Sequence, residues 1–325
     1  MLESRLHQRL QSKKKQLDQL RPLPDAAVRR LQEQLMVEWI YNSNAIEGNT
    51  LTLRETQLIL ETGLTIGGKS LREHFEVINH RDAIQYVESL VAQTKPITPF
   101  HVRQIHQLVL KEIDSQNAGQ YRQSSVRIAG ADHQPPDAWQ VAHLMDEWSV
   151  WLNDSAQPGN APEDTAPEDT ILEDTIVRAA LAHHRLTAIH PFIDGNGRTA
   201  RLLMNLLLLR AGYPPTIILR TNRRQYYRVL AAADAGHDAP IVNFVGQAVE
   251  RSLTLYLEAC TPQSKPPKQQ ETWIPLREAA RATPYSQEYL SLLARTGRLE
   301  AIKRGRVWYT SQNAISAYQA SLGQP

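Results

Sequence analysis

Apolar residues at spacings of three and four occupy most of the first 260 residues of this chain. From Ala26 to about Ile46 they recur at the interval that places them on one face of an α-helix. Glycine and proline residues mark the turns between such segments. The pattern therefore predicts a mostly α-helical body, in which Tyr121 to Ile128 is the best candidate for extended, β-type chain. The other predicted helices cover residues 53–62, 73–93, 99–113, 176–190, 198–211 and 242–259.

Length and composition indicate an ordinary globular protein with more than one unit. A chain of 325 residues exceeds the usual size of a single domain, and 42% hydrophobic with 22% charged residues is typical of soluble proteins. The 36 basic residues are nearly balanced by 34 acidic ones, which argues against nucleic-acid binding by the chain as a whole. Cys260 is the only cysteine, so an intrachain disulfide and a cysteine-based zinc site are excluded, and a cytoplasmic location is expected.

Two further segments bear on location and organisation. The longest apolar run, Leu202 to Leu209, is too short to span a bilayer, and the N-terminal sequence is polar where a signal peptide needs an apolar segment. We therefore expect no membrane association and interpret this run as a buried helix. Residues 261–271 are polar, contain prolines and lack apolar periodicity, which indicates a linker.

The junction HPFIDGNGRTAR, residues 190–201, has the features of an anion-binding loop. Gly195 and Gly197 allow the backbone to approach a ligand closely. A helix that begins at about Arg198 directs free amide groups and the positive end of its dipole toward the loop. Because Arg198 and Arg201 are three residues apart, both can face an anion at the end of that helix.

Two other side chains of the junction could supply chemistry. Asp194 could hold a magnesium ion that bridges phosphate oxygens, and His190 could take a proton from an attacking hydroxyl near neutral pH. Taken singly, the features have ordinary explanations: DGNG is often just a turn, and a histidine at a helix C-terminus favours the dipole. Together they predict a triphosphate site with a general base.

The same stretch resembles the Fic signature HPFxxGNGRxxR, and it matches at every specified position: His190, Pro191, Phe192, Gly195, Asn196, Gly197, Arg198 and Arg201. The resemblance implies a magnesium- and ATP-dependent enzyme that transfers AMP to a Ser, Thr or Tyr hydroxyl of a target protein or of itself. It implies that His190 is the general base and that Asp194 binds magnesium. Gly195, Asn196 and Gly197 would hold the phosphates, Arg198 and Arg201 would neutralise the departing pyrophosphate, and Phe192 would anchor the loop in the core.

Two residues downstream are weaker site candidates. The segment RQYYRVL resembles the nucleoside-binding region of the same family, which points to Tyr227 and to the nearby Asp234. A core aromatic residue and an exposed helical carboxylate are equally good interpretations of these two residues.

The stretch SNAIEGNT, from Ser43 to Thr50, resembles the SxxxEG inhibitory motif of Fic proteins whose inhibitory helix precedes the catalytic core. Glu47 would lie in the last turn of a helix, where a negative charge opposes the helix dipole at a cost of about 0.3–1 kcal/mol. An arginine partner would compensate this cost. The resemblance implies that the partner is Arg201, and that Ser43 and Glu47 belong to a device that blocks productive placement of the γ-phosphate.

The stretch from Gly119 to Gly130 resembles the flap of the family, a short β-hairpin that pairs with the main chain of the target. Val126, Arg127 and Ile128 would then be the docking residues. Main-chain pairing reads little side-chain sequence, so the target is not identified by these residues. A plain structural hairpin is the alternative.

The C-terminal segment has a composition of its own. It predicts two short helices separated by Pro284, followed by a hairpin, and it resembles the winged helix-turn-helix of excisionase-like proteins. Residues 271–325 carry seven Lys or Arg against four Asp or Glu, a net charge of +3. Lys303, Arg304 and Arg306 form a basic hairpin tip that could contact DNA phosphates. Protein docking and dimerisation are other uses of such modules.

The resulting prediction is a mostly α Fic core with a short β-hairpin flap and a small winged helix-turn-helix domain. Its parts are an N-terminal helical region with the inhibitory helix at 1–95, a catalytic core at 96–260, a linker at 261–271 and the C-terminal module at 272–325. One alternative is an enzyme that removes AMP, with Glu47 orienting water. Another is a DNA-binding regulator whose core only senses nucleotide, which the intact His190 disfavours. The sequence also allows a homo-oligomer.

Overall fold

The computed structural model describes residues 1–93, 95–128, 130, 132–154, 168–260, 273–281, 283–296, 298–305 and 307–322. The chain divides into two compact units, Met1–Thr261 and Pro262–Pro325. The linker predicted at 261–271 lies outside the described residues. The N-terminal helices and the segment with the signature loop belong to one unit, because their buried side chains form one hydrophobic core.

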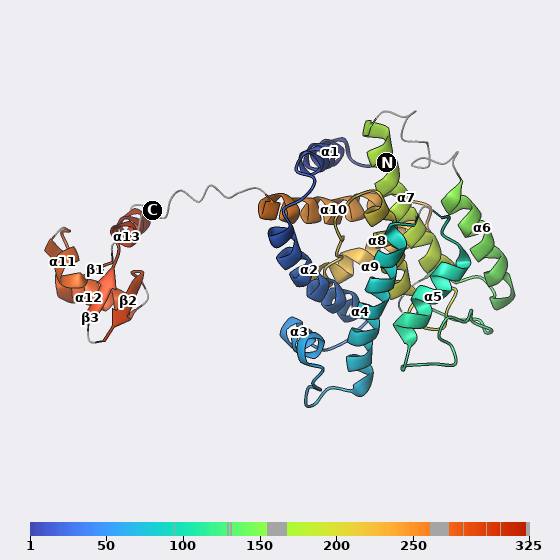
Figure 1. Cartoon of the computed structure of the whole chain (residues 1–325), viewed down its shortest axis with the longest axis horizontal. Helices are drawn as coiled ribbons and strands as arrows, with labels where there is room; N and C mark the ends of the chain where they lie inside the picture. The colour runs from blue at the N-terminus through green and yellow to red at the C-terminus, as the bar shows by residue number, and fades with distance from the viewer. Residues whose placement is uncertain are drawn as a thin grey trace. The chain divides into compact units, whose positions relative to one another are not determined.

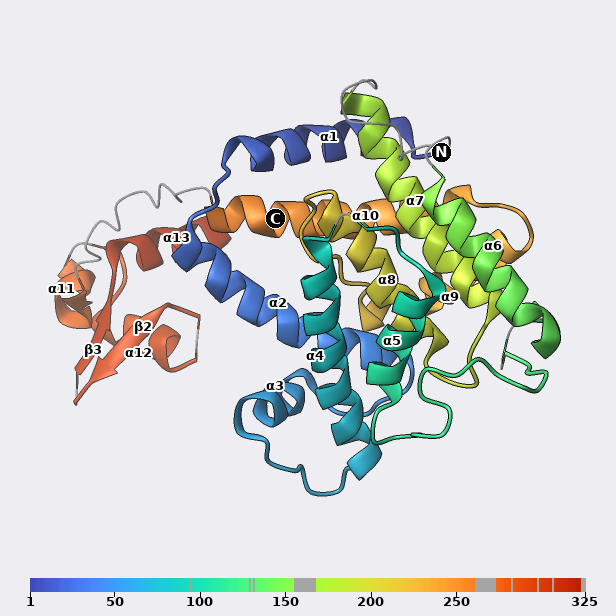
Figure 2. The same ribbon diagram turned by 45° about the vertical axis from the view of Figure 1, so that its right-hand side comes forward.

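All the regular secondary structure in the described part of the larger unit is helical (Figure 1, Figure 2). Short 3₁₀ turns at Ala138–Gln140 and Arg220–Asn222 precede two of the helices. The helices are α1 (Ser4–Gln19), α2 (Asp25–Ile46), α3 (Leu53–Thr62), α4 (Leu71–Val91), α5 (Pro99–Leu110), α6 (Val141–Asn153), α7 (Glu168–Ile189), α8 (Asn196–Arg210), α9 (Arg223–Asp234) and α10 (Ala239–Cys260).

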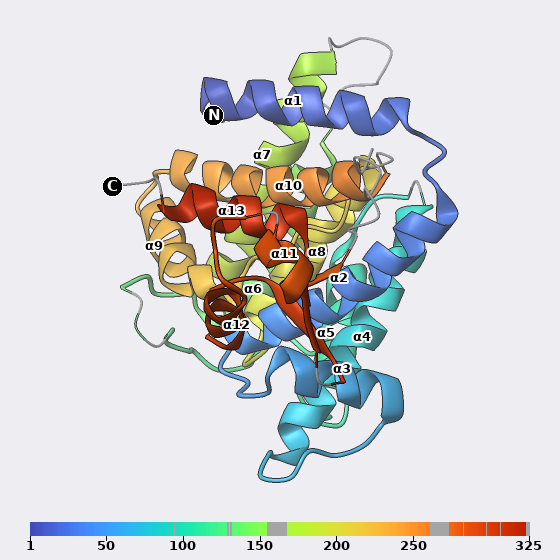
Figure 3. The ribbon, with the colours of Figure 1, turned by 90° about the vertical axis from the view of Figure 1, so that its left-hand side faces the viewer.

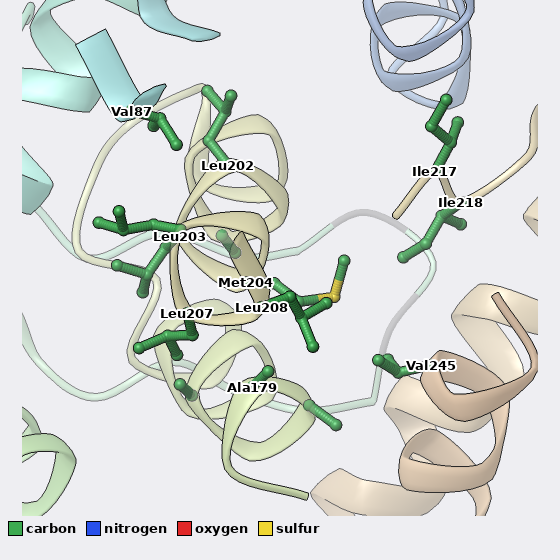
Figure 4. Close-up of a cluster of buried hydrophobic side chains, with 14 of the residues drawn as sticks. Val87, Ala179, Leu202, Leu203, Met204, Leu207, Leu208, Ile217, Ile218 and Val245 are labelled. Atoms are coloured by element: carbon green, nitrogen blue, oxygen red, sulfur yellow. The ribbon is translucent and has the colours of Figure 1, made fainter. Parts of the chain in front are cut away.

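Helix α8 is the centre of this unit. Its side chains from Arg198 to Leu208 are buried, and the apolar ones from Leu202 to Leu208 face several neighbouring helices, as expected for a helix in the core. Figure 4 shows the apolar part of this helix surrounded by side chains that include Val87 of α4, Ala179 of α7 and Val245 of α10. The interpretation of the Leu202 to Leu209 run as a buried helix is therefore confirmed. Because α7, α4 and α5 all pack on α8, the loop at its N-terminus is held from several sides.

Capping residues explain where two helices begin. Thr52 and Glu55 form a capping box at the start of α3, and Gly63 ends this helix in the left-handed conformation. Ser70 and Glu73 form the same motif at the start of α4. Helix α4 therefore begins two residues before the predicted start at Glu73, which is its third helical residue.

The expectation of a β element at Tyr121 to Ile128 is wrong for the residues that the structure describes. These residues are not paired as strands, and the hairpin expected between Gly119 and Gly130 is not present as a ladder within the described part of that stretch. The backbone itself gives the reason, since the amide of Arg122 donates to the carbonyl of Pro191 at 3.0 Å instead of to a neighbouring strand. This segment is thus tied to the signature loop.

The smaller unit has its own core and a small sheet (Figure 3). Strand β1 (Ile274–Pro275) precedes helices α11 (Leu276–Arg281) and α12 (Gln287–Arg295), strands β2 (Ala301–Arg304) and β3 (Val307–Thr310) follow, and α13 (Gln312–Leu322) ends the described chain. The sheet order is β1-β3-β2, and both pairs are antiparallel. The two short helices and the hairpin were expected. Their identity as a winged helix-turn-helix stays a prediction.

None of the helices in the described ranges combines the length and the apolar character needed to cross a bilayer.

Candidate active site

The signature loop joins α7 to α8 and ends at the first turn of α8. Gly195 has φ +78° and immediately precedes the helix, a conformation that L side chains rarely adopt. A Cβ at this position would lie 3.2 Å from Cδ2 of His106, so space as well as backbone conformation calls for glycine. The amides of the first turn of α8 consequently face the loop, where they can bind an anion.

The loop is fixed by its own side chains. The side-chain amide of Asn196 makes two hydrogen bonds to the backbone of Phe192. Its Oδ1 accepts from the N–H of Phe192 at 3.0 Å, and its Nδ2 donates to the carbonyl of Phe192 at 2.8 Å. Phe192 is fully buried. Because the side chain of Asn196 is engaged in this way, a contact between Asn196 and a phosphate would come from its backbone.

His106 on α5 supports the loop through contacts with Phe192 and Asp194. Sequence reasoning missed this role. The ring of His106 stacks on Phe192 with 3.6 Å between ring centroids. Nδ1 accepts from the amide of Gly119 at 3.0 Å, so Nε2 carries the hydrogen and donates to the carbonyl of Asp194 at 2.9 Å. Burial lowers the pKa of His106 to about 4. The ring therefore stays neutral and keeps both hydrogen bonds at neutral pH.

His190 follows the last residue of α7 with a positive φ of 51°. Its Nδ1 lies 3.3 Å from the carbonyl of Thr187, a contact that assigns the hydrogen to Nδ1 and leaves Nε2 as the acceptor that a general base requires. Burial, with a smaller contribution from the charge of Arg122, lowers the pKa of His190 below its ordinary value of 6.5. The imidazole is therefore neutral at pH 7.

Arg122 is a second supporting residue that sequence reasoning missed. Its buried guanidinium donates from Nε to the carbonyl of His190 at 2.8 Å and from Nη1 to the carbonyl of Ser124 at 3.0 Å, and a further bond reaches the carbonyl of Pro136. These bonds hold the backbone of the histidine in its unusual conformation.

Arg201 and Glu47 form the ion pair that the inhibitory motif implied. Arg201 Nη2 and Glu47 Oε1 are 2.7 Å apart, and the side chains are 2% and 30% exposed. The arginine also donates to the hydroxyl of Ser43 at 3.0 Å, to the carbonyl of Ser43 at 2.8 Å and to the hydroxyl of Tyr226 at 3.4 Å. Burial opposes the charge of Arg201, but the nearby Glu47 carboxylate and Tyr226 raise its pKa above the ordinary value.

The Glu47 carboxylate also lies against the loop backbone. Glu47 directly follows Ile46, the last residue of α2, and Gly48 comes next with φ +106°. A Cβ on Gly197 would be 2.3 Å from Glu47 Oε1 and 3.0 Å from Arg201 Nη1. The carboxylate therefore occupies space beside the glycine backbone where the sequence predicts bound phosphate.

Asp194 is surrounded by positive groups. Its Oδ1 accepts from the amide of Gly195 at 2.6 Å and pairs with Arg198 Nη2 at 3.1 Å, while Oδ2 pairs with Arg72 Nη2 at 2.6 Å. Burial opposes ionisation, but Arg198, the Gly195 amide and Arg72 together lower the pKa of the Asp194 carboxyl. Arg198 Nη1 lies 3.3 Å from Glu76 Oε1 of α4.

The donor set fits a magnesium ion that is bound together with nucleotide. Within the described ranges, no group of three or more His, Cys, Asp or Glu side chains could hold a metal by itself. Magnesium is usually held by one or two carboxylates together with substrate phosphates and water. Asp194, with 43% of its side chain exposed, can be such a single carboxylate.

The two weaker candidates, Tyr227 and Asp234, have different partners in the structure. Tyr227 packs next to the ring of Tyr226, and the guanidinium of Arg223 lies 4.8 Å from the centre of its ring. Asp234, the last residue of α9, instead pairs with Nε2 of His184 on α7 at 2.9 Å. Tyr226, which sequence reasoning passed over, is the tyrosine that contacts Arg201.

The remaining candidates are the residues of the expected flap and of the basic hairpin tip. Arg127 is exposed, and Val126 and Ile128 are half-buried. In the smaller unit, exposed Lys303 lies 5.9 Å from the ring centre of Trp308. The side chain of Arg304 and all of Arg306 lie outside the described residues.

Comparisons with known proteins show which family the sequence and the fold resemble. A family model for the Fic/DOC family matches residues 96–208. Fic-1 of C. elegans (residues 134–508) is a solved structure that is 34% identical, covers 78% of this chain and is itself covered to 71%, with a TM-score of 0.67. The chain belongs to the Fic/DOC family.

Two other Fic relatives cover a similar share of the chain. A Fic domain containing signaling protein of Bacteroides thetaiotaomicron is 28% identical, covers 79% of this chain and is covered to 98%, with a TM-score of 0.69. The protein adenylyltransferase Fic of Drosophila grimshawi is 40% identical over 244 residues, which are 74% of this chain and 47% of the fly protein. The chain thus spans about half the length of the curated relatives it matches.

Proposed function

We propose that this protein is an adenylyltransferase that moves AMP from ATP to a Ser, Thr or Tyr hydroxyl of a target protein or of itself. The main support is the complete signature loop, folded so that His190 has a free acceptor nitrogen beside a helix N-terminus with two buried arginines. The name of the fly relatives, protein adenylyltransferase Fic, supports the same reaction.

In this proposal His190 acts on the target and not on the nucleotide. Its Nε2 takes the proton as the hydroxyl oxygen attacks the α-phosphorus of ATP. A new oxygen–phosphorus bond forms, the bond from the α-phosphorus to the bridging oxygen breaks, and pyrophosphate leaves. The lowered pKa of His190 keeps the ring neutral, and therefore able to accept this proton, at pH 7.

The phosphates would be held by the first turn of α8. The amides near Gly195 and Gly197 bind phosphate oxygens, and Arg198 and Arg201 neutralise the charge that builds up on pyrophosphate. Both arginines are almost fully buried, so their charges act with little screening by water. Asp194 would hold magnesium, which supplies further neutralisation of the phosphate charge when it is bound.

We further propose that the protein rests in an inhibited state. Glu47 holds Arg201 by a 2.7 Å ion pair and lies against Gly197, so the γ-phosphate of ATP cannot use the same arginine and the same space. Ser43 supports this state because it also accepts hydrogen bonds from Arg201.

The target would pair with the extended segment that contains Val126, Arg127 and Ile128. This segment is not part of a ladder in the described structure, and an added strand could use its free main-chain groups. We also propose that the smaller unit is a docking module, with DNA phosphates as one candidate ligand for the exposed Lys303.

The deciding experiment is incubation of the full chain with α-labelled ATP, magnesium and cell extract, followed by mass spectrometry of the labelled protein. Addition of one AMP to a hydroxyl side chain supports the proposal. In a parallel incubation with a target that already carries labelled AMP, release of AMP without any new transfer would favour the opposite, AMP-removing reaction, with Glu47 orienting water. Nucleotide binding without either reaction would favour a sensing role.

A further inference from the structure

Four charged side chains, one of which is Asp194, form a closed ring of ion pairs. Arg72 pairs with Asp194 at 2.6 Å and with Glu76 at 3.5 Å, and Arg198 pairs with the same two carboxylates at 3.1 and 3.3 Å. The signature loop supplies Asp194 and Arg198, whereas Arg72 and Glu76 come from α4. Two positive and two negative side chains make the ring neutral.

The two oxygens of Asp194 have different partners. Oδ1 is engaged by the Gly195 amide and by Arg198, both of which belong to the loop and its helix. Oδ2 contacts Arg72. Oδ2 is therefore the oxygen with which a metal ion would coordinate Asp194, and the guanidinium of Arg72 stands in that place.

Arg72 can leave this position at small cost. Its side chain is 57% exposed, and an exposed ion pair is worth only about 0–1 kcal/mol. A second carboxylate, Glu76, already lies 3.5 Å away on the next turn of the same helix. The arginine can therefore keep a negative partner when it releases Asp194.

We infer that Arg72 is a restraint on the metal site: it occupies Oδ2 of Asp194 in the resting protein and must turn toward Glu76 before a divalent cation can bind there with nucleotide. This inference rests on the proposed function, in which Asp194 holds magnesium. The restraint acts on the cation, whereas the Glu47 pair acts on the arginine that would bind the γ-phosphate.

The test measures binding, not turnover. The full chain carrying His190→Ala, which prevents transfer, is titrated with magnesium at a fixed concentration of a fluorescent ATP analogue, and the midpoint of the magnesium titration is recorded. Arg72→Gln keeps a long polar side chain but removes the charge. We expect it to lower the midpoint about two- to fivefold, the range that corresponds to an exposed pair.

Arg81→Gln is the matched control. Arg81 lies on the same helix, is paired with its neighbour Asp82 and is not in the ring, so it should leave the midpoint unchanged. Manganese can replace magnesium in the same titration, and its binding is followed by the loss of the electron paramagnetic resonance signal of free Mn²⁺. This gives a second measurement of the shift in the midpoint. Thermal melting checks that each variant is folded.

Several outcomes are decisive. A midpoint for Arg72→Gln that equals or exceeds that of the parent overturns the inference. Weaker binding of the analogue in the absence of any divalent cation also overturns it, since Arg72 would then be a phosphate ligand. If the parent itself binds the analogue with no dependence on magnesium, the metal role of Asp194 fails, and with it both this inference and that part of the proposed function.

Discussion

Replacing Glu47 with glycine should activate AMP transfer. The substitution removes the carboxylate that lies 2.7 Å from Arg201 and occupies the space beside Gly197. Arg201 should stay in place, because it keeps its bonds to Ser43 and to Tyr226. Glu47 lies just beyond the last residue of α2, so glycine at this position should cost less than it would inside a helix.

The size of the effect follows from the strength of the pair. A hydrogen bond between charged groups contributes about 1.5–3 kcal/mol net, and the 30% exposure of Glu47 favours the lower part of that range. Since about 1.4 kcal/mol corresponds to a factor of ten, the lower half of that range predicts that transfer rises about ten- to fortyfold when ATP no longer competes with the carboxylate.

The assay is incorporation of α-labelled AMP into the protein itself and into several extracts, at matched protein concentration. Glu61→Gly, near the end of α3 and outside the site, is the matched control and should behave like the parent. Arg201→Ala also breaks the pair, but it should stay inactive because it removes a charge that stabilises the transition state.

The double substitution gives the sharpest test of the pair. Glu47→Gly combined with Arg201→Ala should be no more active than Arg201→Ala alone, as expected for residues that share one interaction. Parent-level incorporation by Glu47→Gly in every extract would refute the reasoning. Reduced AMP release from a premodified target, without a gain in transfer, would show that Glu47 serves AMP removal.

Three other predictions concern separate features. His190→Ala should reduce transfer by about 10²–10⁴-fold while binding of an ATP analogue is retained. In the parent protein the transfer rate should reach half its maximum below pH 6.5, because the pKa of His190 is lowered. A midpoint at or above pH 6.5 in the pH–rate profile would contradict the role of His190 as general base. The buried rings of His183 and His106 have pKa values of about 3 and about 4, so folding requires their neutral forms, and the stability that they contribute is lost as the pH falls below 6.5. In urea unfolding, the free energy of unfolding should fall by up to about 1.4 kcal/mol per pH unit for each ring. Equal free energies of unfolding at pH 7 and pH 5 would contradict this pH dependence. If the smaller unit binds DNA, a filter-binding series should show affinity that falls steeply with salt and a smaller slope for Lys303→Gln; no binding by the full chain at low salt would favour protein docking.

The fold was predictable where local signals agree with packing. Helix α3 has the predicted bounds, because a capping box at Thr52 and a left-handed glycine at position 63 set both ends. Helix α1 was not predicted as a separate element, since its sequence is largely polar and only a narrow stripe that includes Leu6, Leu10 and Leu17 packs inward. The β element at Tyr121 to Ile128 was predicted wrongly because the backbone partner of Arg122 lies about seventy residues away in the signature loop.

The site was predictable where its residues are contiguous in sequence. The loop from His190 to Arg201 and the motif around Glu47 carry recognisable spacings. The residues that hold them do not, because their contacts arise only when distant helices pack. A histidine on an apolar helical face, such as His106, or an arginine in a loop, such as Arg122, has no local pattern that indicates such a role. The same is true of Arg72 on α4 and Tyr226 on α9.

If the Glu47–Arg201 pair inhibits transfer as proposed, its strength implies that the protein is never fully switched off. A contact worth about 1.5–3 kcal/mol leaves roughly 1–10% of the molecules released at any moment. Covalent AMP marks would outlast each brief release, so they would accumulate slowly even without a signal. A cell that contains this protein would then need either a constant means of erasing the mark or turnover of the marked proteins, and the steady level of the mark would report the balance of the two rates.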